Sequence, residues 1–95
     1  MIEIVDPPKG TILRQGDVAH FRVRAAGKTP PSKIIVIGLD AQLEDRSPNL
    51  ETVYDVHVPV DLPVGTYQIH VMAQWPSTTE EKDRIYSDTV DFFVQ

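Results

Sequence analysis

The stretch Leu62-Pro63-Val64-Gly65-Thr66-Tyr67 decides how the rest of this 95-residue chain is interpreted. It predicts a turn that leads directly into a strand, because Pro63 restricts its own φ and Gly65 provides backbone freedom that other residues lack. A buried tyrosine ring needs a partner for its hydroxyl, so we expect Tyr67 to be mostly buried and bonded to a backbone group between Pro59 and Leu62. Leu62, Gly65 and Tyr67 are therefore the residues that we treat as fold-defining.

Apolar and polar residues alternate in several other segments, as they do in half-buried strands. Such segments run from Val18 to Arg24, from Leu50 to Val60 and from Ile85 to Val94, and Ala41 to Glu44 is consistent with a short edge strand. No segment keeps a helical period of apolar residues. The sequence therefore predicts two packed sheets, and the core residues expected between them are Phe21, Val23, Tyr54, Ile69, Val71, Val90 and Phe92.

The beginning of the chain predicts a strand that changes sheets. Ile2 to Val5 and Thr11 to Leu13 both read as strand segments, and Asp6-Pro7-Pro8-Lys9-Gly10 separates them. Neither proline can donate a hydrogen bond to a sheet ladder. We therefore expect the first segment to pair in one sheet and the second segment to pair in the other.

These motifs resemble those of bacterial and archaeal immunoglobulin-like surface domains. The resemblance rests on Pro8-x-Gly10 and Gly16-Asp17-Val18 in the first half, and on Leu62-Pro63-x-Gly65-x-Tyr67 and Ser87-Asp88-Thr89-Val90-x-Phe92-x-Val94 in the second. Filamin-like, fibronectin-like and carbohydrate-enzyme accessory modules share such motifs. The resemblance implies an all-β, immunoglobulin-like Greek-key sandwich of about seven antiparallel strands, with Tyr67 in a tyrosine corner. Unlike antibody domains, the chain has no cysteine pair for a disulfide.

Composition restricts the partners that are expected. A formal net charge of −5 argues against nucleic acid and against an anionic membrane surface. No apolar run reaches the length of a membrane-spanning helix, so no membrane insertion is expected. Residues 1–95 are interpreted as a single domain cut from a longer multidomain protein, because strand-like sequence begins directly after Met1 and continues almost to the last residue.

The sequence offers no strong catalytic, cofactor or metal site. No serine lies in a nucleophile motif, and thiolate chemistry is excluded by the absence of cysteine. His20 and His57 with Asp55 would suit zinc on neighbouring strands, but we favour solvated histidines among cross-strand pairs of Arg22 or Arg24 with Asp55. Two acidic loops, expected at separate ends of the sandwich, lack the spacing of a calcium loop and are interpreted as solvated; their residues are Asp40, Glu44 and Asp45, and Glu80, Glu81 and Asp83.

The segment from Lys33 to Leu39 is apolar on both faces, so one alternating set must face away from the core. If it shares a sheet with the strands of Met72 and Phe93, as this fold implies, an outer apolar face results. Ile35, Ile37, Met72 and Phe93 are therefore predicted to form a contact surface toward a neighbouring domain or a second copy. Trp75 and Tyr86 are candidates for a carbohydrate platform, although for Trp75 we favour closing the core at the end of the sandwich.

The expected function is that of a non-enzymatic structural or interaction module, which spaces or presents the domains beside it. The expected partners are neighbouring domains of the same chain or other surface proteins. An accessory carbohydrate-binding module of a larger extracellular enzyme and a protein-binding adaptor are the alternatives. An extracellular or cell-surface location, with the periplasm as an alternative, is implied by the resemblance alone.

Overall fold

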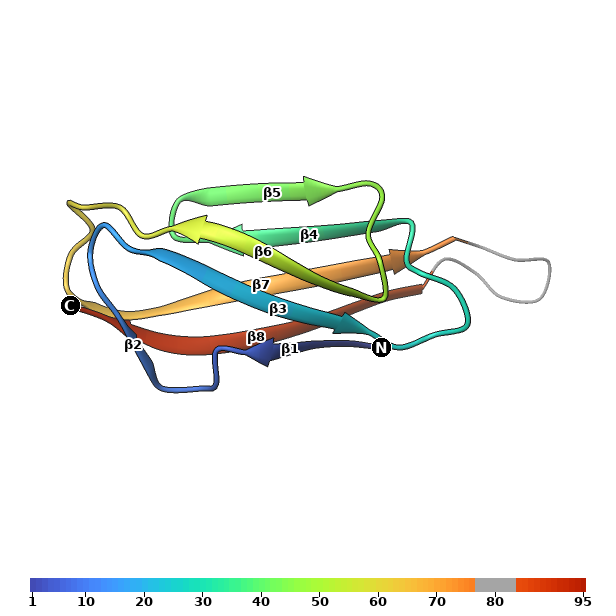
Figure 1. Cartoon of the computed structure of the whole chain (residues 1–95), viewed down its shortest axis with the longest axis horizontal. Helices are drawn as coiled ribbons and strands as arrows, with labels where there is room; N and C mark the ends of the chain where they lie inside the picture. Colours follow the sequence, from blue (N-terminus) through green and yellow to red (C-terminus); the bar gives the residue numbers. More distant parts are fainter. Residues whose placement is uncertain (77–83) are drawn as a thin grey trace.

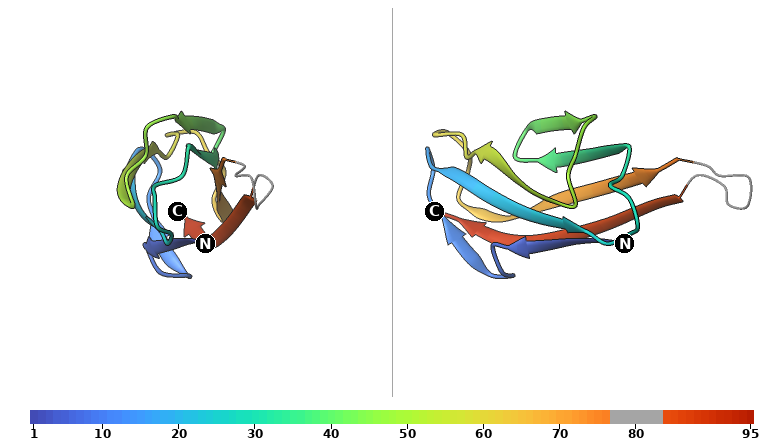
Figure 2. Two further views of the ribbon diagram at one scale, coloured as in Figure 1. Left: turned by 90° about the vertical axis from the view of Figure 1, so that its right-hand side faces the viewer. Right: turned by 45° about the vertical axis from the view of Figure 1, so that its right-hand side comes forward.

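Two β-sheets make up the described part of the chain. A computed structural model describes residues 1–76 and 84–95; residues 77–83, which include the acidic residues Glu80, Glu81 and Asp83, lie outside the described part. The strands are β1 (Ile2–Asp6), β2 (Thr11–Leu13), β3 (Val18–Ala25), β4 (Lys33–Gly38), β5 (Ala41–Asp45), β6 (Glu51–His57), β7 (Gly65–Trp75) and β8 (Arg84–Val94). Their order is β1-β3-β6 in one sheet and β2-β8-β7-β4-β5 in the other (Figures 1 and 2). The predicted all-β, two-sheet architecture is confirmed, with eight strands where about seven were expected.

The first strand changes sheets as predicted. β1 pairs with β3 in antiparallel orientation, and β2 pairs with β8 in the opposite sheet. The β2–β8 pair is parallel, so the prediction that all strands are antiparallel was wrong for this pair. The physical reason is that the chain keeps its direction across the Asp6–Gly10 break while its hydrogen-bonding partner changes.

A continuous apolar core fills the space between the sheets. All seven predicted core residues are buried, and the rings of Phe21 and Phe92 meet with centroids 6.1 Å apart. Inward residues alternate with outward ones along β3, β6 and β7, as the period of two in the sequence predicted. The apolar segment β4 divides in the same way: Ile34 and Val36 are buried, whereas Ile35 and Ile37 face outward.

The corner before β7 exists, but its hydrogen bond differs from the prediction. The Tyr67 hydroxyl donates to the carbonyl oxygen of Pro63 at 2.6 Å, so the acceptor lies just after the predicted region, and the ring is only half-buried. Leu62 is buried, and its carbonyl oxygen accepts a hydrogen bond from Nε2 of Gln15. Gly65 is not among the residues with positive φ, and a Cβ there would meet nothing within 4 Å. The expected need for glycine at this position was therefore wrong.

The connection between β4 and β5 is a two-residue turn. Leu39 and Asp40 both have positive φ, 52° and 61°, which is the conformation of a type I′ hairpin turn. The turn pairs Gly38 with Ala41 and makes β5 the edge strand of the five-stranded sheet. The prediction of a short edge strand at Ala41–Glu44 is confirmed, with Asp45 added.

Candidate functional site

The outer face of the five-stranded sheet carries all four residues of the predicted contact surface. Ile35 lies directly opposite Met72 on the neighbouring strand, and Ile37 lies opposite His70. We call Ile35, Ile37 and Met72 the outer cluster. Its side chains range from half-buried to exposed, although Ile35 and Met72 cover part of each other's surface as a cross-strand pair.

Phe93 lies apart from the outer cluster. Met72 is opposite Ser87, whereas Phe93 lies six residues farther along β8, opposite Thr66. At a rise of about 3.3 Å per residue, this separation is about 20 Å. Phe93 instead sits beside Ile12 of β2, with which it is in register.

Polar pairs occupy the sheet between the two apolar groups. Nε2 of Gln68 donates to Oδ1 of Asp91 at 2.6 Å, and Nδ1 of His70 lies 2.9 Å from Oγ1 of Thr89. The structure therefore brings Ile35, Ile37 and Met72 together and does not bring Phe93 to them. A partner that bound both groups would have to cover this polar stripe as well.

The two aromatic candidates for a carbohydrate platform differ sharply in exposure. Trp75 is only 3% exposed, and its indole N–H donates to the carbonyl oxygen of Thr29 at 2.9 Å. It therefore closes one end of the core and offers no open ring face. Tyr86 is 39% exposed and contacts Trp75 edge-on, with ring centroids 5.6 Å apart. Only Tyr86 of this pair is accessible for stacking.

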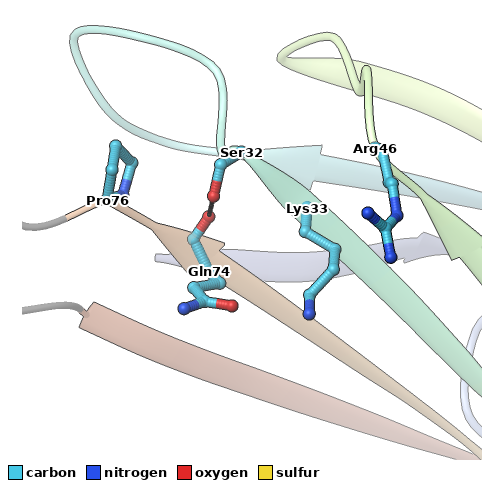
Figure 3. Close-up of a pocket in the computed structure, with 5 residues that line it drawn as sticks. All are labelled: Ser32, Lys33, Arg46, Gln74 and Pro76. Atoms are coloured by element: carbon cyan, nitrogen blue, oxygen red, sulfur yellow. Dashed lines mark hydrogen bonds between the residues drawn. The ribbon is translucent and has the colours of Figure 1, made fainter.

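An open hollow of about 320 Å³ lies where β4 begins and β7 ends. Ser32, Lys33, Arg46, Gln74 and Pro76 line it, and in Figure 3 the side chains of Lys33 and Arg46 extend in the same direction. Both cations contact the carboxylate of Glu44, at 3.7 Å from Lys33 and 3.4 Å from Arg46. The Ser32 hydroxyl donates to the backbone carbonyl of Gln74 at 2.9 Å. These contacts pair the two cations and the Ser32 hydroxyl with groups of the fold itself.

The outer face of the three-stranded sheet carries the histidines considered for zinc. His20 is opposite Asp55, with Nδ1 and Oδ1 2.5 Å apart, whereas His57 is opposite Val18. Residues 1–76 and 84–95 contain no group of three or more metal-ligating side chains arranged around a common point. The β3–β6 register therefore pairs Asp55 with His20 and not with His57.

The cross-strand ion pairs on this face differ from those expected. Arg22 contacts Asp6 at 2.9 Å and Glu51 at 3.4 Å, and Arg24 contacts Glu3 at 3.9 Å. The predicted pairing of Arg22 or Arg24 with Asp55 was wrong, because the β3–β6 register sets His20 opposite that carboxylate and Arg24 opposite Glu51.

Asp45, one of the acidic residues after β4, accepts hydrogen bonds from two groups. Asp45 accepts hydrogen bonds from the Tyr54 hydroxyl at 2.7 Å and from the backbone N–H of Ser47 at 3.0 Å. Burial, and next the bond to Asp45, raise the pKa of Tyr54 well above its ordinary value. Asp45 thus connects the edge of one sheet to β6 of the other.

Within the described part, no serine hydroxyl is paired with a histidine in the manner of an activated nucleophile.

Comparisons with known proteins bear on the fold. No protein-family model and no curated protein matches the sequence. Solved structures of fibronectin(III)-like modules of CbhA from Clostridium thermocellum are similar to this one, with a TM-score of 0.66 and 18% identity over 99% of this chain and 94% of that chain. The chain has an immunoglobulin-like, fibronectin(III)-like fold. The predicted fold class is confirmed. In the described part of this fibronectin(III)-like domain, no helix is long and apolar enough to cross a membrane.

Sequence reasoning missed two features of this fibronectin(III)-like domain. The first is the hollow, whose lining residues come from separate segments and share no spacing in the sequence. The second is the type I′ turn, because Leu39 and Asp40 are not the asparagine and glycine that usually signal such a turn. The signal in the sequence for this turn was Gly38 directly before it, because a glycine inside a strand pattern often marks a place where the backbone approaches its neighbour closely.

Proposed function

We propose that this chain is a non-catalytic structural module of a larger multidomain protein, where it sets the distance between neighbouring domains. The observation that carries the proposal is the position of the chain ends on an elongated sandwich. The molecule measures 48 × 20 × 17 Å. The C-terminus lies at one end of the long axis, and the N-terminus is displaced far toward the other end (Figure 1). Domains joined at these points would be held apart along that axis.

The likeness to the CbhA structures supports the proposal, because those structures are described as modules. A secreted or cell-surface location is part of the proposal and rests on the resemblance of the sequence motifs. The exposed Tyr86 alone does not favour a carbohydrate-binding role, because its neighbour Trp75 is buried. The structural role therefore takes precedence over the carbohydrate alternative.

The outer cluster of Ile35, Ile37 and Met72 is the surface that we propose for contact with a neighbouring domain. It is apolar and lies on the outer face of the five-stranded sheet, next to the Lys33–Glu44 and Arg46–Glu44 pairs, whereas the outer face of the other sheet carries the pairs of Arg22 and Arg24. Burial of an exposed apolar group is the usual gain in such contacts. Phe93 and Ile12 would form a separate contact if a partner reached the far end of the sheet.

The spacer proposal is tested with two copies of the chain joined head to tail by a short linker. Small-angle X-ray scattering should give a maximum dimension that exceeds that of one copy by a large part of the 48 Å long axis, because the N-terminus is displaced toward the end opposite the C-terminus. A particle in which the two copies lie side by side would contradict the proposal. Equilibrium unfolding of the single chain is the control, because a spacer must fold without its neighbours.

A further inference from the structure

β5 is an edge strand whose outward backbone groups are open to pairing. In the turn that joins it to β4, the N–H of Ala41 bonds to the carbonyl of Gly38, as a two-residue hairpin requires. Backbone groups alternate in direction along a strand, so Ala41, Leu43 and Asp45 point toward β4. Gln42 and Glu44 therefore direct their N–H and C=O groups away from the sheet, and Figure 1 shows β5 as the outermost strand on its side.

The inner side of β5 is only partly covered: Ala41 packs against the core and Asp45 accepts a bond from Tyr54, but Leu43 between them is exposed. Leu43 shares the inward face with Val36, its partner on β4, but Val36 is buried and Leu43 is 36% exposed. The difference is consistent with an opposing sheet of three strands against five, which contacts β5 at one end through the bond from Tyr54 to Asp45. β5 thus projects beyond the sandwich with its apolar side chain partly in water.

The other edges are less available. The N–H of Ile4 on β1 donates to Oδ2 of Asp88 on β8 at 2.8 Å, so this edge is closed against the opposite sheet. β2 has only three residues. β5 contains no proline or lysine, and its charged residues are Glu44 and Asp45, of which Glu44 is paired with Lys33 and Arg46 and Asp45 with Tyr54. Within the described residues, β6 is the competing edge, because it lies at the side of the three-stranded sheet opposite β1.

We propose that β5 pairs with β5 of a second copy of this chain, in antiparallel orientation and centred on Leu43. Gln42 then lies opposite Glu44 of the second copy, and both direct their backbone groups into the interface. Leu43 lies opposite Leu43 of the second copy in the closely spaced, non-hydrogen-bonded position. The two five-stranded sheets become one continuous sheet with two-fold symmetry.

The charges that flank β5 suit this register. Asp40 lies in the turn before β5 and Arg46 directly after it, so the register brings Arg46 near Asp40 of the second copy, and the two-fold axis repeats the pair at the other end. Asp40 is exposed in the turn, and the Arg46 side chain is 79% exposed, with its contact to Glu44 at 3.4 Å. No two like charges lie directly opposite each other anywhere between Asp40 and Arg46. The register is therefore favoured by charge as well as by backbone geometry.

The interface is small, so the dimer should be weak. Five residues of one strand from each copy bury far less area than the roughly 1,200–2,000 Å² of a stable complex. We expect association between micromolar and millimolar concentration, which becomes effective where several copies are held close together. The inference does not depend on the spacer function proposed above.

The test uses the isolated chain, studied by sedimentation velocity and by amide NMR spectra from micromolar to millimolar concentration. The amide signals of Gln42 and Glu44 should shift as concentration rises. Gln42→Pro removes the outward N–H without removing a bond to β4, and should weaken association at least about tenfold. Arg46→Glu should weaken association as well, because it opposes two carboxylates, whereas Arg46→Lys should leave association nearly unchanged.

Val53→Pro on β6 is the matched control. Leu50 and Val58 make backbone bonds toward β3, so the odd-numbered residues between them, including Val53, point outward from the competing edge. This variant should associate like the unmodified chain. A chain that remains monomeric at millimolar concentration would overturn the proposal, as would loss of association in Val53→Pro. If the Met72→Ser/Phe93→Ser double variant no longer associates while Arg46→Glu associates normally, the contact lies on the outer sheet face and not at β5.

Discussion

Gly38 is the glycine whose replacement should damage the fold. Its φ is +150°, and a Cβ at this position would lie 2.6 Å from the carbonyl oxygen of Gln68 and 2.6 Å from Cδ1 of Ile69. The Ile69 side chain can shift, but the Gln68 carbonyl is part of the backbone of β7 and cannot move without the strand. We expect Gly38→Ala to lower the free energy of unfolding by about 3 kcal/mol, because overpacking and a sparsely populated φ each cost about 1–3 kcal/mol.

Gly65→Ala is the matched comparison for this prediction. Gly65 has neither a positive φ nor any atom within 4 Å of the added Cβ. The substitution should leave stability unchanged or raise it by about 0.4–1 kcal/mol, because alanine restricts the unfolded chain. Urea unfolding, followed by the fluorescence of Trp75, would measure both variants. Equal shifts of the two midpoints, or a loss below about 1 kcal/mol for Gly38→Ala, would refute the close approach.

Two further predictions concern tyrosine hydroxyls. Tyr67→Phe removes the bond to the Pro63 carbonyl and should lower the free energy of unfolding by about 1 kcal/mol in urea titrations; an unchanged midpoint would mean that water replaces this bond without loss. The raised pKa of Tyr54 means that the folded state keeps its proton above about pH 10, where the unfolded state loses it. Stability should therefore be complete below that pH and fall as pH rises through it, with a shallower fall in Tyr54→Phe; equal slopes for the two proteins would contradict this cause.

The core was predictable from sequence because a strand has a period of two. Once Ile69 and Val71 were assigned inward, the outward position of His70 followed, and the same reasoning applied to Phe21 and Val23. Burial on one face also fixes the register of these strands. The apolar segment β4 could be divided into two sets in the same way.

Features that depend on register or on local dihedral angles were not predictable. The separation of Phe93 from Met72 follows from which residues of β7 and β8 lie opposite each other, and alternation says nothing about that pairing. Glycine in the sequence does not reveal its φ, so Gly65 was given a role that belongs to Gly38. The Tyr67 hydroxyl bonds to the Pro63 carbonyl because the length of the turn decides which carbonyl lies within reach. The spacing of residues in the sequence left several carbonyls as possible acceptors.

The change of sheet by the first strand has a mechanical consequence. β2 runs parallel to the C-terminal strand β8, and bonds from Gly10 to Asp91, from Gln95 to Leu13 and from Gln15 to Gln95 extend this pair at both ends. Tension that draws the N- and C-termini apart acts along the axes of the two strands. The hydrogen bonds between them would then be sheared together, and the force needed for rupture is shared among them. Peeling them apart one after another would require a pull across the strands, which the positions of the chain ends do not provide.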